Sequence, residues 1–125
     1  MEECPTFFDL FIGDDLQAQL LGIQENGDPV PLTGVTDIQI SFPNDPKAQQ
    51  PTPTYTASLI NGQIAVVDAT LGKFSLTIPN AVTQYFLAII GFDVDIVVIF
   101  SGVKTTYRIP AGCNIKNRSY VQYSS

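Results

Sequence analysis

Histidine and tryptophan are both absent from this chain of 125 residues, and only 14% of its residues are charged. The lack of histidine removes the commonest general base and the usual zinc and iron ligand, and with them most nucleophile–base pairs. The motifs GxSxG, GxGxxG, the P-loop and HExxH do not occur either. We therefore predict a protein that is not an enzyme and that uses no cofactor and no metal.

Long apolar runs are also missing, since no window reaches the roughly 18 uninterrupted apolar residues of a membrane span. The first residues, MEECPTFFDL, begin with acids where a secretory signal would need a basic start. We expect a protein that has no membrane partner, is made in the cytoplasm and is not exported by a signal peptide.

Cysteine is scarce, with Cys4 and Cys113 near opposite ends and no CxxC-type metal spacing. A disulfide is conceivable if the first and last strands pair. Two free thiols is the favoured interpretation, because nothing in the sequence indicates an oxidising compartment.

Basic residues are absent from residues 1–46, which carry nine acids and a net charge of −9. Residues 47–125 carry three acids and all six bases, a net of +3, so the total is −6. This acidic balance disfavours a nucleic-acid partner, because the phosphate backbone would be repelled. The asymmetry allows one subunit to offer its basic last quarter to the acidic front of a neighbour. The alternative, which we weigh equally, is that the first and last strands lie side by side and neutralise each other's charge within one molecule.

The candidate interaction residues from these two regions are Asp14, Asp15, Lys104, Arg108, Lys116 and Arg118.

The recurring pattern is an alternation of apolar and polar residues, the spacing of strands with one buried face. It is clearest in TDIQISF, KFSLTIP and VKTTYRI, which end at residues 42, 79 and 109. With short turns between them, the strands predict an all-β, immunoglobulin-like antiparallel sandwich in a single domain over 1–125, with flexible ends at 1–5 and 119–125. About eight strands are expected, at 6–12, 16–23, 35–42, 54–60, 63–67, 73–78, 92–100 and 103–110, with a possible ninth at 112–118.

Turn residues indicate how these strands connect. Asn61-Gly62 is typical of a type I′ hairpin turn, and Ser101-Gly102 predicts a second short hairpin. The stretch NGDPVPLTGVTDIQISF, residues 26–42, predicts a crossing from one sheet to the other. One short helical segment is expected at about 80–90, with Asn80 as its N-cap and Gly91 as its stop.

Two groups of carboxylates deserve a chemical interpretation. Asp93 and Asp95 share a strand face, and such pairs bind cations or act as acid and base. We favour the ordinary interpretation, that they are solvent-facing residues of a half-buried strand. Asp14, Asp15 and Asp28 are typical turn residues, and a Ca²⁺ site would need more ligands at fixed spacing.

The order of these features resembles a known family. The segments that carry the resemblance are FIGDDLQAQLLGI, NGDPVPLTGVTDIQISF, VVDATLGKFSLTIPNAVTQYF and GFDVDIVVIFSGVKTTYRI. Together they are similar to the immunoglobulin-like N-terminal domain of phage baseplate upper proteins and related tail-fibre components. The resemblance implies a non-enzymatic structural protein of a tailed phage or prophage virion, in the tail, the baseplate or a head-associated part. Its implied partners are other virion proteins or further copies of itself.

An alternative is a small carbohydrate- or surface-binding module that works through the proline-rich loop 43–53. That loop has no aromatic residue on which a sugar could stack.

Overall fold

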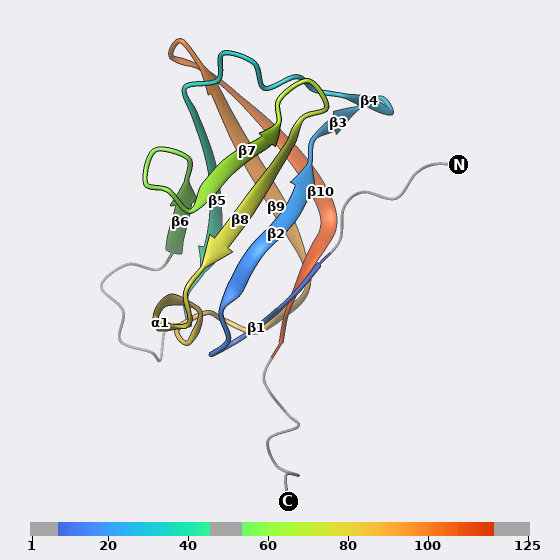
Figure 1. Cartoon of the computed structure of the whole chain (residues 1–125). Helices are drawn as coiled ribbons and strands as arrows, with labels where there is room; N and C mark the ends of the chain where they lie inside the picture. The colour runs from blue at the N-terminus through green and yellow to red at the C-terminus, as the bar shows by residue number, and fades with distance from the viewer. Residues whose placement is uncertain (1–7, 46–53, 117–125) are drawn as a thin grey trace, which may run out of the picture.

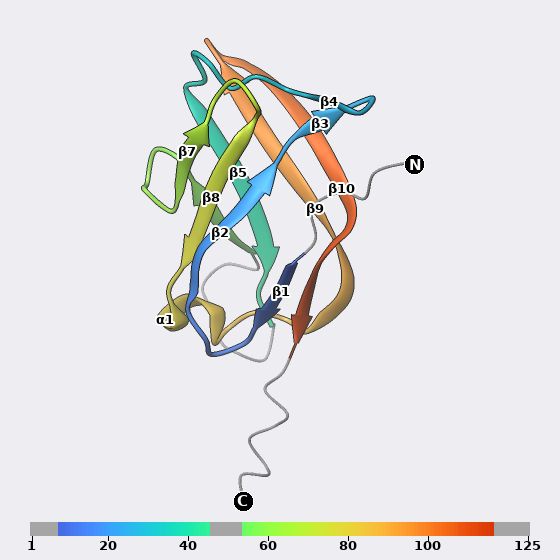
Figure 2. The same cartoon turned by 45° about the vertical axis from the view of Figure 1, so that its right-hand side comes forward.

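The computed structural model describes residues 8–45 and 54–116 of the chain. In these residues two β-sheets pack face to face, and one short helix lies at the lower end of the sandwich (Figure 1; Figure 2). The predicted all-β sandwich is confirmed. The predicted flexible ends and most of the loop 43–53 lie outside the described residues.

The larger sheet has five strands in the order β1-β10-β9-β5-β6. Its neighbours are antiparallel, except that β1 runs parallel to β10. The strands are β1 (Phe8–Phe11), β5 (Asp37–Pro43), β6 (Thr54–Ser58), β9 (Ile89–Phe100) and β10 (Val103–Lys116).

The smaller sheet has the order β2-β8-β7, and a two-stranded hairpin of β3 and β4 follows β2. These strands are β2 (Leu16–Gly22), β3 (Gln24–Glu25), β4 (Asp28–Pro29), β7 (Ile64–Asp68) and β8 (Lys73–Ile78). The arrangement is that of an immunoglobulin-like sandwich, in which strands B, E and D form one sheet and strands G, F, C and C′ form the other. Here β2, β8 and β7 take the first set of positions, and β10, β9, β5 and β6 take the second.

The stretch 26–42 carries the chain from the smaller sheet to the larger one, as predicted. Asn26 and Gly27, with φ of 56° and 85°, turn the β3–β4 hairpin. Leu32 then anchors the connection, because its side chain is buried and its N–H donates to the carbonyl oxygen of Ala69 at 2.7 Å. The chain then enters β5 at Asp37.

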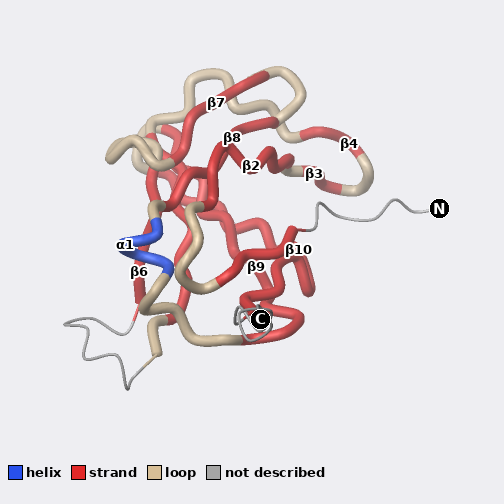
Figure 3. Tube along the Cα trace, turned by 60° about the horizontal axis from the view of Figure 1, so that its bottom comes forward, coloured by secondary structure: helices blue, strands red, loops and turns tan. Residues whose placement is uncertain are grey.

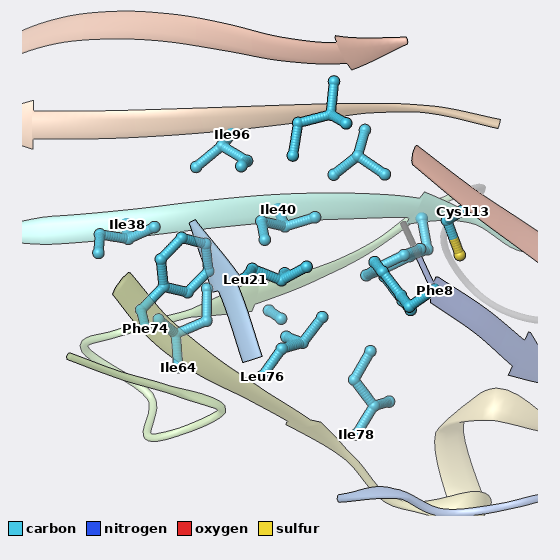
Figure 4. Packing of buried hydrophobic residues seen from close by; sticks show 14 of the residues in the cluster. Phe8, Leu21, Ile38, Ile40, Ile64, Phe74, Leu76, Ile78, Ile96 and Cys113 are labelled. Atoms are coloured by element: carbon cyan, nitrogen blue, oxygen red, sulfur yellow. The ribbon is translucent and has the colours of Figure 1, made fainter. Parts of the chain in front are cut away.

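The core lies between the two sheets and is built from the alternate residues of each strand (Figure 4). The apolar positions of β8 face those of β5 and β9 across the sandwich. All of the following side chains are at most 1% exposed: Ile38, Ile40, Phe42, Ile64, Phe74, Leu76, Ile78, Ile96 and Val98. Burial of such side chains is the main favourable contribution to folding.

The helix prediction is correct in place and wrong in length. The helix α1 covers only Asn80–Thr83, and Pro79 rather than Asn80 occupies the N-cap position. The chain leaves the helix because Phe86 forms a bridge with Asn44 and stacks on Phe42, with ring centroids 5.3 Å apart. Gly91, the predicted stop, lies within β9.

The two predicted hairpin turns have different outcomes. Ser101 and Gly102, with φ of 48° and 87°, form the tight β9–β10 turn as expected. Asn61-Gly62 does not form a hairpin, because β6 pairs with β5 in the larger sheet and β7 pairs with β8 in the smaller one. Gly62 has positive φ and Asn61 does not, whereas a type I′ turn needs positive φ at both central residues.

The possible ninth strand is the end of β10, which runs to Lys116. A register shift between Ile109 and Cys113 interrupts its pairing with β9. Gly112 permits this bulge, since a Cβ at that position would lie 2.7 Å from the Ile109 side chain.

Candidate interaction surfaces

Arg108 is the centre of a charged cluster on the outer face of the larger sheet. The β9–β10 register places it opposite Asp95. Its Nε and one terminal nitrogen donate to the two carboxylate oxygens of Asp95 at 2.7 and 3.0 Å, and the other terminal nitrogen lies 4.0 Å from Asp93. The two aspartates therefore share a face, as predicted. The guanidinium of Arg108 lies between them and contacts both carboxylates.

This pairing sets the charge state of Asp95. The hydrogen bonds from Arg108 lower the pKa of the Asp95 carboxyl and are the largest cause of its shift. Burial opposes them in part, and the positive charge of the guanidinium lowers the pKa by a smaller amount. The same pair raises the pKa of Arg108. A general acid would need a raised carboxyl pKa, so Asp95 is suited to an ion pair rather than to proton donation.

Asp14 and Asp15, the predicted acidic part of the interaction surface, lie in the loop between β1 and β2 beside α1. Asp15 Oδ1 accepts the N–H of Asn80 at 2.6 Å, which satisfies a donor in the first turn of the helix. The hydroxyl of buried Thr83 donates to the backbone oxygen of Asp14 at 2.8 Å and accepts the N–H of Gly13 at 3.2 Å. The loop and the helix are thus joined by three hydrogen bonds.

Lys116 lies at the lower end of β10, next to the first strand. Its Nζ is 3.3 Å from Asp9 Oδ2 and 5.8 Å from the centre of the Phe11 ring. Asn114, two residues earlier, also donates to Asp9. The first and last strands therefore neutralise part of their charge within one molecule.

Of the other two predicted bases, only Lys104 belongs to the described residues. Lys104 is exposed near the β9–β10 turn, at the opposite end of the sandwich from the β1–β2 loop (Figure 1). Arg118 lies outside the described residues. Among the described residues, the ion pair of Asp9 and Lys116 joins the acidic first third of the sequence to its basic last quarter.

Asp37 is a carboxylate that the sequence did not single out. It is 5% exposed, and its Oδ1 accepts the N–H groups of Ile38 and Ile60 at 2.9 and 3.2 Å. Its Oδ2 accepts the side-chain amide of Gln39. Asp37 holds the loop after β6 against the start of β5. Its place on the polar face of an alternating strand gave no sign of burial.

Cys113 is fully buried opposite Phe8 of β1, and burial raises the pKa of its thiol to about 12. The first and last strands do pair, and Cys113 carries a free thiol, whereas Cys4 lies outside the described residues.

The apolar run from Ile96 to Phe100 is fully buried on one face only. Ile96 and Val98 are buried in the core, whereas Val97 and Ile99 point to the outer face and stay half-buried. The helix α1 lies at the end of the sandwich and does not cover them (Figure 2).

Within residues 8–45 and 54–116, no group of three or more His, Cys, Asp or Glu side chains is placed to hold a metal ion. No helix in the described part of the chain is long and apolar enough to cross a membrane. Comparisons of the chain with known protein families, with curated proteins and with solved structures gave no match.

Proposed function

We propose that this chain is a non-enzymatic structural component of a tailed phage or prophage virion. It acts in the tail, the baseplate or a head-associated part, through protein–protein contacts in a symmetric assembly. Its partners are other virion proteins, further copies of itself, or both, and it reaches the virion from the host cytoplasm.

The observation that carries this proposal is the way two motifs of the phage resemblance meet in the fold. Leu32-Thr33-Gly34 belongs to the connection between the sheets, and Gly72-Lys73-Phe74 opens β8. The two motifs are distant in sequence, yet the backbone N–H of Leu32 donates a hydrogen bond to the carbonyl oxygen of Ala69, in the turn that leads to Gly72. A Cβ at buried Gly72 would lie 2.4 Å from the carbonyl oxygen of Val30, so the two segments are closely fitted. The motifs are parts of one packing arrangement, which supports a resemblance of whole domains.

The charged residues are consistent with a scaffold. Asp95 is held by Arg108, Asp9 by Lys116, and Asp15 caps the helix. These side chains are engaged in contacts that hold the domain together, which is a structural role.

The proposal is tested on particles released from cells that carry the phage or prophage. Intact particles are separated on a density gradient, washed in high salt, and analysed by quantitative mass spectrometry. We expect the chain to remain in a constant ratio to the major capsid protein across the particle peak. A soluble host enzyme, followed in the same fractions, is the control for trapped material. Recovery of the chain only with the soluble proteins would refute the proposal.

A glycan array provides the matching test of the carbohydrate alternative. Binding that is lost when the loop 43–53 is replaced by glycine and serine would favour that alternative over a virion role.

A further inference from the structure

Two Asn-Gly pairs lie in turns, Asn26-Gly27 between β3 and β4 and Asn61-Gly62 between β6 and β7. Asparagine is chemically labile in proteins. It is most labile before glycine, which has no side chain to block the attack of its nitrogen on the asparagine amide. The reaction needs an attacking nitrogen without a hydrogen bond and a backbone that can rotate. Both pairs are exposed to water, so the hydrogen bonds of each turn decide which pair reacts.

The turn at Asn26 is weakly held. All residues from 24 to 29 are exposed, and the hairpin lies at the margin of the molecule (Figure 3). Its two strands have two residues each, and Glu25 lies opposite Asp28 in the pair next to the turn. Like charges directly opposite each other destabilise a strand pair, and a two-stranded hairpin is marginal in water by itself. The tip of this hairpin therefore opens at little cost.

The attacking nitrogen of this turn is available. In the part of the chain that the structure describes, no hydrogen bond uses the N–H of Gly27 or the side chain of Asn26. Asn26 has φ of 56°, a left-handed conformation that is unfavourable for a residue with a side chain. Rotation of Asn26 out of the turn therefore breaks no bond at Gly27 and relieves this conformation.

The turn at Asn61 is tied by hydrogen bonds. The N–H of Gly62, which carries the attacking nitrogen, donates to Leu59 C=O at 3.1 Å. The N–H of Asn61 donates to Ser58 Oγ at 3.1 Å, and the N–H of Gln63 donates to Ser58 C=O at 3.1 Å. Attack on the Asn61 side chain therefore requires this turn to open first.

We propose that Asn26 is a site of spontaneous deamidation in the folded protein, from which Asn61 is protected. The nitrogen of Gly27 forms a bond to Cγ of Asn26 and loses its proton, and the side-chain nitrogen leaves as ammonia. Water then adds to one of the two carbonyl carbons of the resulting succinimide and opens the ring, which gives aspartate or isoaspartate. The reaction consumes water, releases ammonia and needs no oxidant or reductant.

The product alters the charge and the backbone of the hairpin tip. A carboxylate replaces a neutral amide between Glu25 and Asp28, and in isoaspartate the main chain also runs through Cβ, which lengthens the turn. The base of the hairpin is held separately, because Val30 N–H donates to Ile23 C=O at 2.9 Å and Ile23 N–H donates to Gly72 C=O at 3.1 Å. The modification therefore changes the surface at the tip and leaves the core in place.

One incubation compares the two sites. The full chain is kept in mildly alkaline buffer, digested, and analysed by peptide mass spectrometry with a separation that resolves isoaspartate. We expect Asn26 to deamidate about tenfold faster than Asn61 in the folded protein, because the hydrogen bonds of the Asn61 turn must open first. The chain unfolded in urea is the control, and there the two rates should converge because both asparagines precede glycine. Equal rates in the folded chain, or the same rate ratio in urea, would overturn the proposal.

A variant in the protected turn tests the cause of the difference. Ser58→Ala removes the Oγ that accepts the Asn61 N–H, and it should raise the deamidation rate of Asn61 about fivefold while leaving that of Asn26 unchanged. Circular dichroism confirms that the variant is folded. An unchanged rate at Asn61 in the folded variant would contradict protection by hydrogen bonds. Neither result bears on the proposed virion role, because the inference depends only on the two turns.

Discussion

The carboxylate of Asp15 accepts a hydrogen bond of 2.6 Å from the backbone N–H of Asn80, across 65 positions in the chain. The short helix is thus capped by a residue from the β1–β2 loop and not by its own N-cap, which is Pro79. Asp15→Ala should lower the free energy of unfolding by about 1 kcal/mol, the usual cost of a lost cap. Asp15→Asn keeps an acceptor and should cost much less. Urea unfolding of both variants checks this, and equal losses would show that charge, not the hydrogen bond, matters.

Gly72 occupies a site where a side chain has no room. It has φ of 69°, and a Cβ would meet Val30 C=O at 2.4 Å and Ile23 C=O at 3.0 Å. Gly62 also has positive φ but open space around it, so it is the matched control. Gly62→Ala should cost about 1–2 kcal/mol for the left-handed backbone alone. Gly72→Ala should lower the free energy of unfolding by about 1–3 kcal/mol more than Gly62→Ala, because of steric crowding. Similar melting temperatures of the two variants would contradict the close fit of the two segments.

Asp37 should be important for the loop after β6. Asp37→Ala removes the acceptor for the Ile60 N–H and leaves the buried Ile38 N–H without its side-chain partner. We expect a loss of about 1–3 kcal/mol in unfolding free energy. Hydrogen exchange at Ile60 should accelerate as well, while exchange at Val98, in the centre of the larger sheet, changes only with global stability. Unchanged exchange at Ile60 would remove Asp37 from this role.

The ion pair of Arg108 and Asp95 should make a pH-dependent contribution to stability. Because the folded-state pKa of Asp95 is lower than its ordinary value of 3.8, the contribution is complete above that pH. It is lost as pH falls through the lowered folded-state pKa. Arg108→Gln should therefore melt below the wild type at pH 7, and the difference should shrink progressively as the pH falls below 3.8. Both groups are partly exposed, so the effect should be small and should shrink in high salt. A difference that stays constant as the pH falls below 3.8 would mean that Arg108 acts through packing.

The strands were predictable because alternation is a local property. Ile38, Ile40 and Phe42 had to face one side wherever the strand was placed, and the structure confirms it. The helix was overestimated because the partner of Phe86 is Phe42, which is remote in the sequence. Its apolar spacing fits a helix, but packing against β5 takes the chain out of the helix at Thr83.

The candidate interaction surface was also predictable only where local spacing decides the outcome. That Asp93 and Asp95 share a face follows from their spacing of two. That Arg108 joins them depends on the register between β9 and β10, which the sequence does not reveal. Asn61-Gly62 has the composition of a hairpin turn, yet the strands on either side find better partners in different sheets.

The parallel pairing of β1 with β10 determines how the domain bears a load. Phe8 lies beside Cys113 and Phe11 beside Lys116, so the two strands run in the same direction. Tension applied between the start of β1 and the end of β10 pulls the strands in opposite directions along their length. The ladder is then loaded in shear, and its hydrogen bonds share the force instead of opening one after another. The Asp9–Lys116 contact joins the same two strands and adds to their resistance to this shear.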